Sequence, residues 1–200
     1  LDMDGSLSGN IESIIRGYPA RNIIEQQRKG EGAQTILSQL FFDRYNLVYV
    51  DSASIQLVDD LQRKLILKAR FRLPEYTLSF ADALDFNPLI IGYRQQNPID
   101  SDYKRVLPIQ LEAPEYIQLN FDIQLPKKLS HDLQDFNQRA QIPMGFLSES
   151  YDFDRNRLQY RLEVGFSART YDASLAGRIS DIYQRWVDLS NARWKLNRLP

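Results

Sequence analysis

The sequence of 200 residues contains no cysteine and only one histidine, His131. The absence of cysteine excludes disulfides, zinc–thiolate sites, iron–sulfur clusters and thiol nucleophiles within this segment. A single histidine excludes metal sites built from several imidazoles, and no serine or threonine lies in a nucleophile-elbow sequence. We therefore expect His131 to be a surface-loop histidine, and we predict neither a cofactor nor a metal site.

The chain also lacks an excess of charge and long apolar runs. Its 25 lysines and arginines against 26 aspartates and glutamates give a net charge of -1, too small to attract nucleic acid or anionic membranes. The longest apolar runs stop after four residues, whereas a membrane helix needs about 18. The polar, acidic stretch after Leu1 has no signal-peptide pattern. We expect a segment that neither binds nucleic acid nor inserts into a membrane.

Hydrophobic periodicity predicts three helices. Apolar residues between positions 20 and 44 recur at spacings of three and four, and the glycine-containing residues 29–32 divide this stretch into two helices. A similar apolar stripe from Leu175 to Leu189 predicts a helix near the C-terminus, capped by Asp172 or Ser174. Charged side chains on its other face are expected in water, namely Arg178, Asp181, Arg185 and Asp188.

Alternation of apolar and polar residues predicts strands. Residues 117–125 alternate at every position, residues 65–73 alternate similarly, and residues 53–57 do so more weakly. Residues 146–153 and 158–166 flank a polar connection that suits a hairpin turn, so this pair is predicted to be antiparallel. Tyrosines and phenylalanines fall mainly at apolar-phase positions, which predicts core packing and not a ligand platform.

Together these patterns predict an α+β, mainly antiparallel β fold. Residues 1–85 are expected to form strands plus the helical pair, and residues 86–200 a β-sandwich-like unit with the C-terminal helix. The boundary is placed where turn residues are most frequent, from Phe86 to Asp102.

Two groups of residues suggest chemistry. Asp2-Met3-Asp4-Gly5 resembles the nucleophile motif of haloacid-dehalogenase-type phosphatases, but no buried strand precedes Asp2, so we favour an acidic turn that opens a strand. A phosphatase using Asp2 and Asp4 is the least favoured function. Lys68, Arg70 and Arg72 form a basic row opposite Phe71. A solvated face is favoured for this row, and the alternative is a free-standing module that binds an anionic glycan or protein there.

Short motifs follow one another along most of the chain. They are Asp2-x-Asp4-Gly5-x-Leu7-x-Gly9, Gly17-Tyr18-x-Ala20-Arg21, Asn87-Pro88-Leu89-Ile90, Arg105-x-x-Pro108, Leu125-Pro126 and Ser148-x-Ser150-Tyr151-x-Phe153-Asp154-x-Asn156-x-Leu158. Their order resembles the β-rich region that follows the catalytic domain in bacterial transglutaminase-like proteins.

The resemblance implies an exported or envelope-associated multidomain protein, located in the periplasm or cell envelope. It also implies that the catalytic Cys, His and Asp belong to a preceding papain-like core, which agrees with the absence of cysteine here. The expected function is a non-catalytic accessory module. It would support the transglutaminase-like domain of the same chain, or contact its substrate or an envelope partner such as a protein or glycan.

Overall fold

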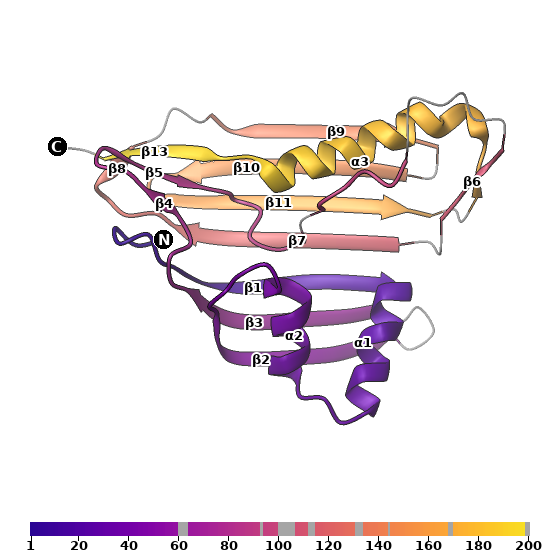
Figure 1. The fold of residues 1–200 in the computed structure, drawn as a ribbon, viewed down its shortest axis with the longest axis horizontal. Helices are drawn as coiled ribbons and strands as arrows, with labels where there is room; N and C mark the ends of the chain where they lie inside the picture. The colour runs from indigo at the N-terminus through magenta and orange to yellow at the C-terminus, as the bar shows by residue number, and fades with distance from the viewer. Residues whose placement is uncertain are drawn as a thin grey trace.

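The computed structural model describes residues 1–59, 64–92, 94–99, 107–111, 115–130, 134–143, 145–167 and 170–198. Its largest element is an antiparallel sheet of seven strands (Figure 1). These strands are β1 (Leu7–Gly17), β2 (Tyr49–Asp59), β3 (Lys64–Leu73), β7 (Glu115–Gln124), β9 (Phe136–Ile142), β10 (Gly145–Asp154) and β11 (Arg157–Phe166). Their spatial order is β2-β3-β1-β7-β11-β10-β9.

Three helices accompany the sheet: α1 (Tyr18–Arg28), α2 (Ala33–Phe42) and α3 (Ala176–Asn191). The predicted break between the first two is confirmed, and Gly30 adopts a φ of 87° there. Asp172 caps the short 3-10 helix η1 (Ala173–Leu175) that leads into α3, since its carboxylate accepts the Ser174 amide at 2.8 Å. The α+β, mainly antiparallel class is therefore confirmed.

The helices cover one face of the sheet. Figure 1 shows α1 and α2 over β1, β3 and β2, and α3 over the other half of the sheet. Alternate strand residues point toward them, so Leu67, Phe71 and Leu119 are almost fully buried. The Phe42 ring of α2 lies 5.1 Å from the Phe71 ring of β3, measured between centroids. The alternation predicted from residues 65–73 and 117–125 thus places the core.

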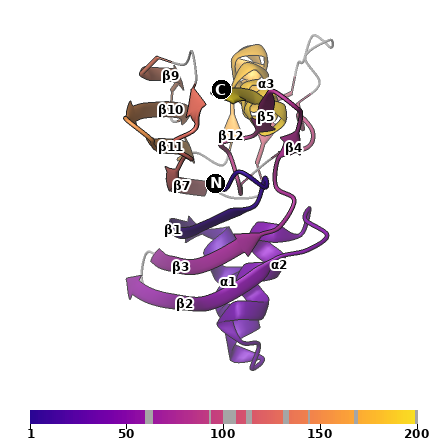
Figure 2. The same ribbon diagram turned by 90° about the vertical axis from the view of Figure 1, so that its left-hand side faces the viewer.

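Short strands complete this covered side. A four-stranded sheet has the order β4-β5-β13-β8, and β6 pairs with β12. Figure 2 shows β5 and α3 to one side of β7, β11, β10 and β9. The bounds are β4 (Leu78–Ser79), β5 (Ala83–Phe86), β6 (Ile109–Gln110), β8 (Leu129–Ser130), β12 (Thr170–Tyr171) and β13 (Trp194–Arg198). The sequence patterns had not indicated β13, which follows α3.

The predicted hairpin is confirmed as β10 and β11, joined by a turn in which Arg155 has a φ of 56°. The proposed division into residues 1–85 and 86–200 stays a prediction about folding units. In space the two segments share one sheet, because β1 pairs with β7 from Ile11 opposite Phe121 to Gly17 opposite Glu115.

Residues 87–92 and 94–99, which we call the strap, run along α3 from the end of β5. The Asn87 side-chain amide donates to the carbonyls of Leu189 and Ser190 at 3.2 and 2.8 Å, and its oxygen accepts the Leu89 amide at 2.7 Å. The Trp186 indole donates to the Gly92 carbonyl at 2.7 Å. The Asn87 amide thus caps carbonyls in the last turn of α3, where Leu189 also accepts the Ala192 amide at 3.3 Å.

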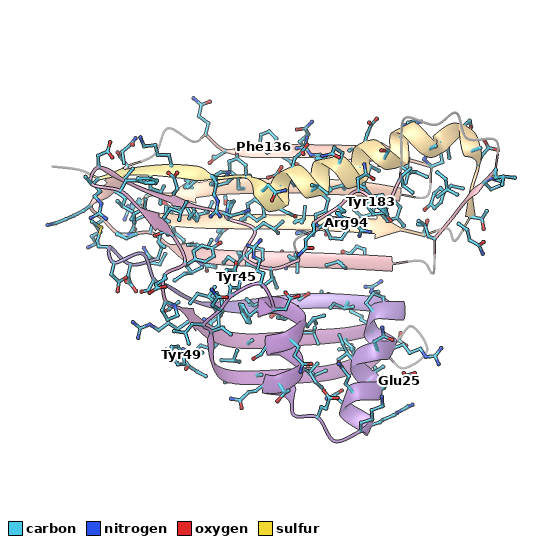
Figure 3. The ribbon with its side chains drawn as sticks, in the orientation of Figure 1. Glu25, Tyr45, Tyr49, Arg94, Phe136 and Tyr183 are labelled. Atoms are coloured by element: carbon cyan, nitrogen blue, oxygen red, sulfur yellow. The ribbon has the colours of Figure 1, made fainter. Side chains whose placement is uncertain are left out.

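A cation–π contact also holds the strap. The Arg94 guanidinium lies 4.3 Å from the centroid of the Tyr183 ring, and the two labelled side chains approach each other in Figure 3. Leu89, Ile90 and Ile91 of the strap are buried. The turn-rich stretch near the predicted boundary is therefore part of the core packing.

A buried ion pair joins α3 to the sheet. The Glu149 carboxylate, whose residue is only 4% exposed, accepts a bond from Arg185 at 3.1 Å and one from the Tyr160 hydroxyl at 3.1 Å. Burial raises the pKa of Glu149, although Tyr160 and Arg185 oppose this. The expectation that Arg185 faces water was wrong, because this position of α3 faces β10.

Replacing Asn87 by alanine tests the role of the strap. Asn87→Ala removes three hydrogen bonds, two of them buried, and takes the side-chain donor from the Ser190 carbonyl, so the free energy of unfolding should fall by about 2–4 kcal/mol. Urea denaturation measures this change. The control is Asn191→Ala, which truncates an exposed asparagine on the same helix and should change stability by less than about 0.5 kcal/mol. Equal losses in both variants would contradict the role assigned to Asn87.

The raised pKa of Glu149 predicts how stability depends on pH. The folded state binds this proton more tightly than the unfolded state, so the stabilisation is complete below the unfolded pKa and is lost as pH rises through the folded pKa. The unfolding free energy of wild type minus that of Glu149→Gln should therefore decrease from pH 4.5 upward. Arg185 opposes the rise in the pKa of Glu149, so the same difference measured in an Arg185→Met background should decrease more steeply with pH. Parallel stability profiles for wild type and Glu149→Gln would refute this account.

Candidate binding face

The second face of the seven-stranded sheet, which we call the open face, carries mainly polar side chains. Each strand contributes alternate residues to it, because neighbouring side chains point to opposite sides of a sheet. They line a groove of about 1100 Å³ that reaches every strand of the sheet. The polar lining residues are Ser52, Ser54, Arg70, Lys68, Asn10, Glu12, Asn120, Asp122, Gln159, Arg161, Ser150, Asp152, Asp135 and Asn137.

Strand register aligns these residues in rows across the sheet. One complete row consists of directly paired residues from β2 to β9, namely Ser54, Lys68, Glu12, Asn120, Arg161, Ser150 and Asn137. Seven strands at a spacing of about 4.8 Å make the row about 29 Å long. The open face therefore offers a continuous polar track that runs across the strands.

The predicted basic row lies on this face. Lys68 and Arg70 are exposed, with 57% and 71% of their side-chain surface accessible, and Phe71 points into the core as expected. However, Lys68 Nζ lies 3.0 Å from Glu12 Oε2, and Arg70 Nε lies 3.8 Å from Asp51 Oδ2. Acidic residues on adjacent strands thus compensate the charges of Lys68 and Arg70. Arg72 is the third predicted cation.

Further ion pairs give the open face a mixed charge. Arg157 pairs with Asp122, and Arg161 pairs with Glu163. The hydrogen bond from Arg157 lowers the pKa of Asp122, so this carboxylate stays ionised well into the acidic range. The groove is lined by three cations and four carboxylates, so no single sign dominates its field.

Two aromatic side chains, Tyr116 and Phe146, also lie on the open face, although core packing was predicted for most tyrosines and phenylalanines. Tyr116 lies on the same side of β7 as Gln118 and Asn120, and Phe146 lies on the same side of β10 as Ser148. The ring centroids of Tyr116 and Phe146 are 6.5 Å apart. Because alternate residues of a strand share a face, the polar residues two positions away from Tyr116 and Phe146 predict that both rings lie on this face.

Asp2 and Asp4 lie in a turn that opens β1. The Gly5 amide donates to the Asp2 carbonyl at 3.0 Å, and the Ser6 amide donates to Asp4 Oδ1 at 2.9 Å. The backbone bond from Ser6 lowers the pKa of Asp4. Gly5 has a φ of 87°, so the expected acidic turn with a permissive glycine is confirmed. Throughout the described residues, the paired strands are antiparallel.

His131 lies outside the described residues. Within the part of the chain that the structure describes, no group of three or more histidine, aspartate and glutamate side chains is placed to hold a metal ion. In the same part, no helix has the length and apolar character needed to cross a membrane.

Comparisons with family models, curated proteins and solved structures found no match. The resemblance to the region after a transglutaminase-like core, with its implied location in the periplasm or cell envelope, stays a prediction.

Proposed function

We propose that the chain is a non-catalytic binding module that holds an extended glycan across the open face of its sheet. The observation that carries this proposal is the groove, in which paired side chains form a polar track across all seven strands. A track about 29 Å long suits a chain of several sugar units better than a small metabolite.

The side chains of the groove favour a glycan over other polymers. Sugar hydroxyls both donate and accept hydrogen bonds, and the amides of Asn10, Asn120 and Gln159 can do the same. Nucleic acid needs an excess of cations, but Lys68 and Arg70 already have acidic neighbours. A peptide that added a strand would pair with the backbone of an edge strand, β2 or β9, and run along it, whereas the groove crosses all seven strands.

The groove is also preorganised for binding. Its side chains stand on strands whose opposite face is packed in the core, as with Ile11 and Phe121 between the polar residues of β1 and β7. Backbone positions are therefore set before the ligand arrives, which lowers the entropic cost of association. In the context that the resemblance implies, the module would hold or orient substrate for a transglutaminase-like domain of the same chain.

Removing two amides from the groove should weaken glycan binding. Asn10 and Gln159 are exposed on β1 and β11, so the double variant Asn10→Ala/Gln159→Ala should fold normally. Loss of two hydrogen-bonding groups should weaken the affinity for a neutral hexasaccharide such as cellohexaose about tenfold, as measured by calorimetry. The matched control is Asn22→Ala/Gln27→Ala, which removes the same groups from exposed positions of α1.

NMR shift mapping with the same hexasaccharide locates the binding surface. Shifts should concentrate on alternate residues of the groove, and the α1 control should bind like wild type. Because the groove has mixed charge, affinity for this neutral ligand should change less than about twofold between 50 and 300 mM salt. Shifts confined to the helices, or no shifts at millimolar ligand, would refute the proposed function.

A further inference from the structure

A second pocket, which we call the end pocket, lies at one end of the open face. Its volume is about 430 Å³, which fits a single sugar-sized ring. It is lined mainly by apolar side chains and glycines, in contrast to the polar groove. The residues that matter here are Arg16, Tyr116, Gln141, Phe146, Gly165 and Phe166.

Strand pairing and one glycine bring the two aromatic rings together. Tyr116 and Phe146 both pair with Gly165, from β7 and β10 on either side of β11. A Cβ atom on Gly165 would come within 2.8 Å of the Phe146 ring. Because Gly165 has no side chain, the Phe146 ring lies across β11 toward Tyr116. The rings form an apolar surface at one end of a face that is mainly polar.

An arginine stands beside each ring. The Arg16 guanidinium lies 5.4 Å from the centroid of the Tyr116 ring, and the Arg139 guanidinium lies 4.2 Å from that of Phe146. Such contacts orient the planar cations and restrict their motion. The arginines therefore support the ring pair at both ends.

Arg16 differs from the predicted basic row in its electrostatic surroundings. Among the described residues, no carboxylate forms an ion pair with Arg16, and its Nε atom is buried without a hydrogen-bond partner. The nearby Glu163 is engaged by Arg161 and by the Tyr116 hydroxyl, which donates to it at 3.1 Å. Lys68 and Arg70, in contrast, have their own acidic neighbours.

We propose that the end pocket binds a carboxylated sugar unit of the glycan, with its ring on Tyr116 and Phe146 and its carboxylate on Arg16. The inference rests on the proposed function and adds the class of sugar that the site selects. The apolar C–H face of a pyranose ring matches an aromatic surface. A carboxylate matches the planar donors of a guanidinium.

Two probes that share the same sugar rings but differ in charge test this inference. Hexagalacturonate carries a carboxylate on every ring, and its methyl ester keeps the rings but removes the charge. Wild type should bind the acid about tenfold more tightly than the ester, as expected for a charge-assisted hydrogen bond. Arg16→Gln should abolish this preference. Its control is Arg72→Gln, which removes the same charge from an exposed position of the open face and should retain the preference.

Ring variants separate stacking from charge. Phe146→Ala should weaken binding of the acid and the ester by similar factors, whereas Tyr116→Phe should retain stacking because the ring remains. Thermal unfolding of each variant identifies any loss of fold. Tyr116→Phe keeps the ring beside Arg16 and is therefore the conservative comparison for Arg16→Gln.

The outcomes distinguish this inference from the proposed function. If cellohexaose perturbs the groove but wild type binds the acid and the ester equally, the inference fails and the proposed function survives. An acid preference that persists in Arg16→Gln and disappears in Arg72→Gln would also overturn the inference, because the charge would then be recognised by the basic row. If no glycan produces shifts in either site, both fail.

Discussion

The pairing of β1 with β7 is the constraint on which the rest of the structure depends. It joins β2, β3 and β1 to β7, β11, β10 and β9, so that a single sheet contains segments separated by about a hundred positions in sequence. The same register places Glu12 opposite Asn120, which makes the polar track of the open face continuous. Without this pairing the groove would be two unconnected halves.

One-sided coverage of the sheet explains why the open face is free to bind. The helices, the strap and the short strands all pack against the face that carries Phe71, Leu119 and Leu162. Each large apolar side chain buried there contributes about 1.5–3 kcal/mol. Stability therefore comes from alternate residues of each strand, and the intervening residues can be chosen for a ligand. The end pocket is an example. Gly165 has no side chain, so the Phe146 ring can lie across β11.

Local sequence patterns predicted the helices and strands well, but they predicted poorly which distant segments pair or contact each other. The alternation of β3 and β7, the hairpin of β10 and β11 and the break between α1 and α2 all depend on short-range chemistry, and each was predicted. The β1–β7 pairing, the acids beside Lys68 and Arg70, and the buried partner of Arg185 depend on contacts between distant segments. Tyr116 and Phe146 differ from the other rings for another reason: they occupy polar-phase positions of their strands, so their aromatic character alone does not predict which face they lie on.

Amide hydrogen exchange across the β1–β7 pair tests the central claim, that one continuous sheet supports the binding face. The account predicts that amides of residues 11–17 and 115–121 exchange through the same cooperative opening as those of β3 and β11, with free energies that match global unfolding. If β1, β3 and β2 instead open together at a much lower free energy while β7, β11 and β10 stay protected, the sheet consists of two separate units. A groove that spans all seven strands would then not be a stable feature of the molecule.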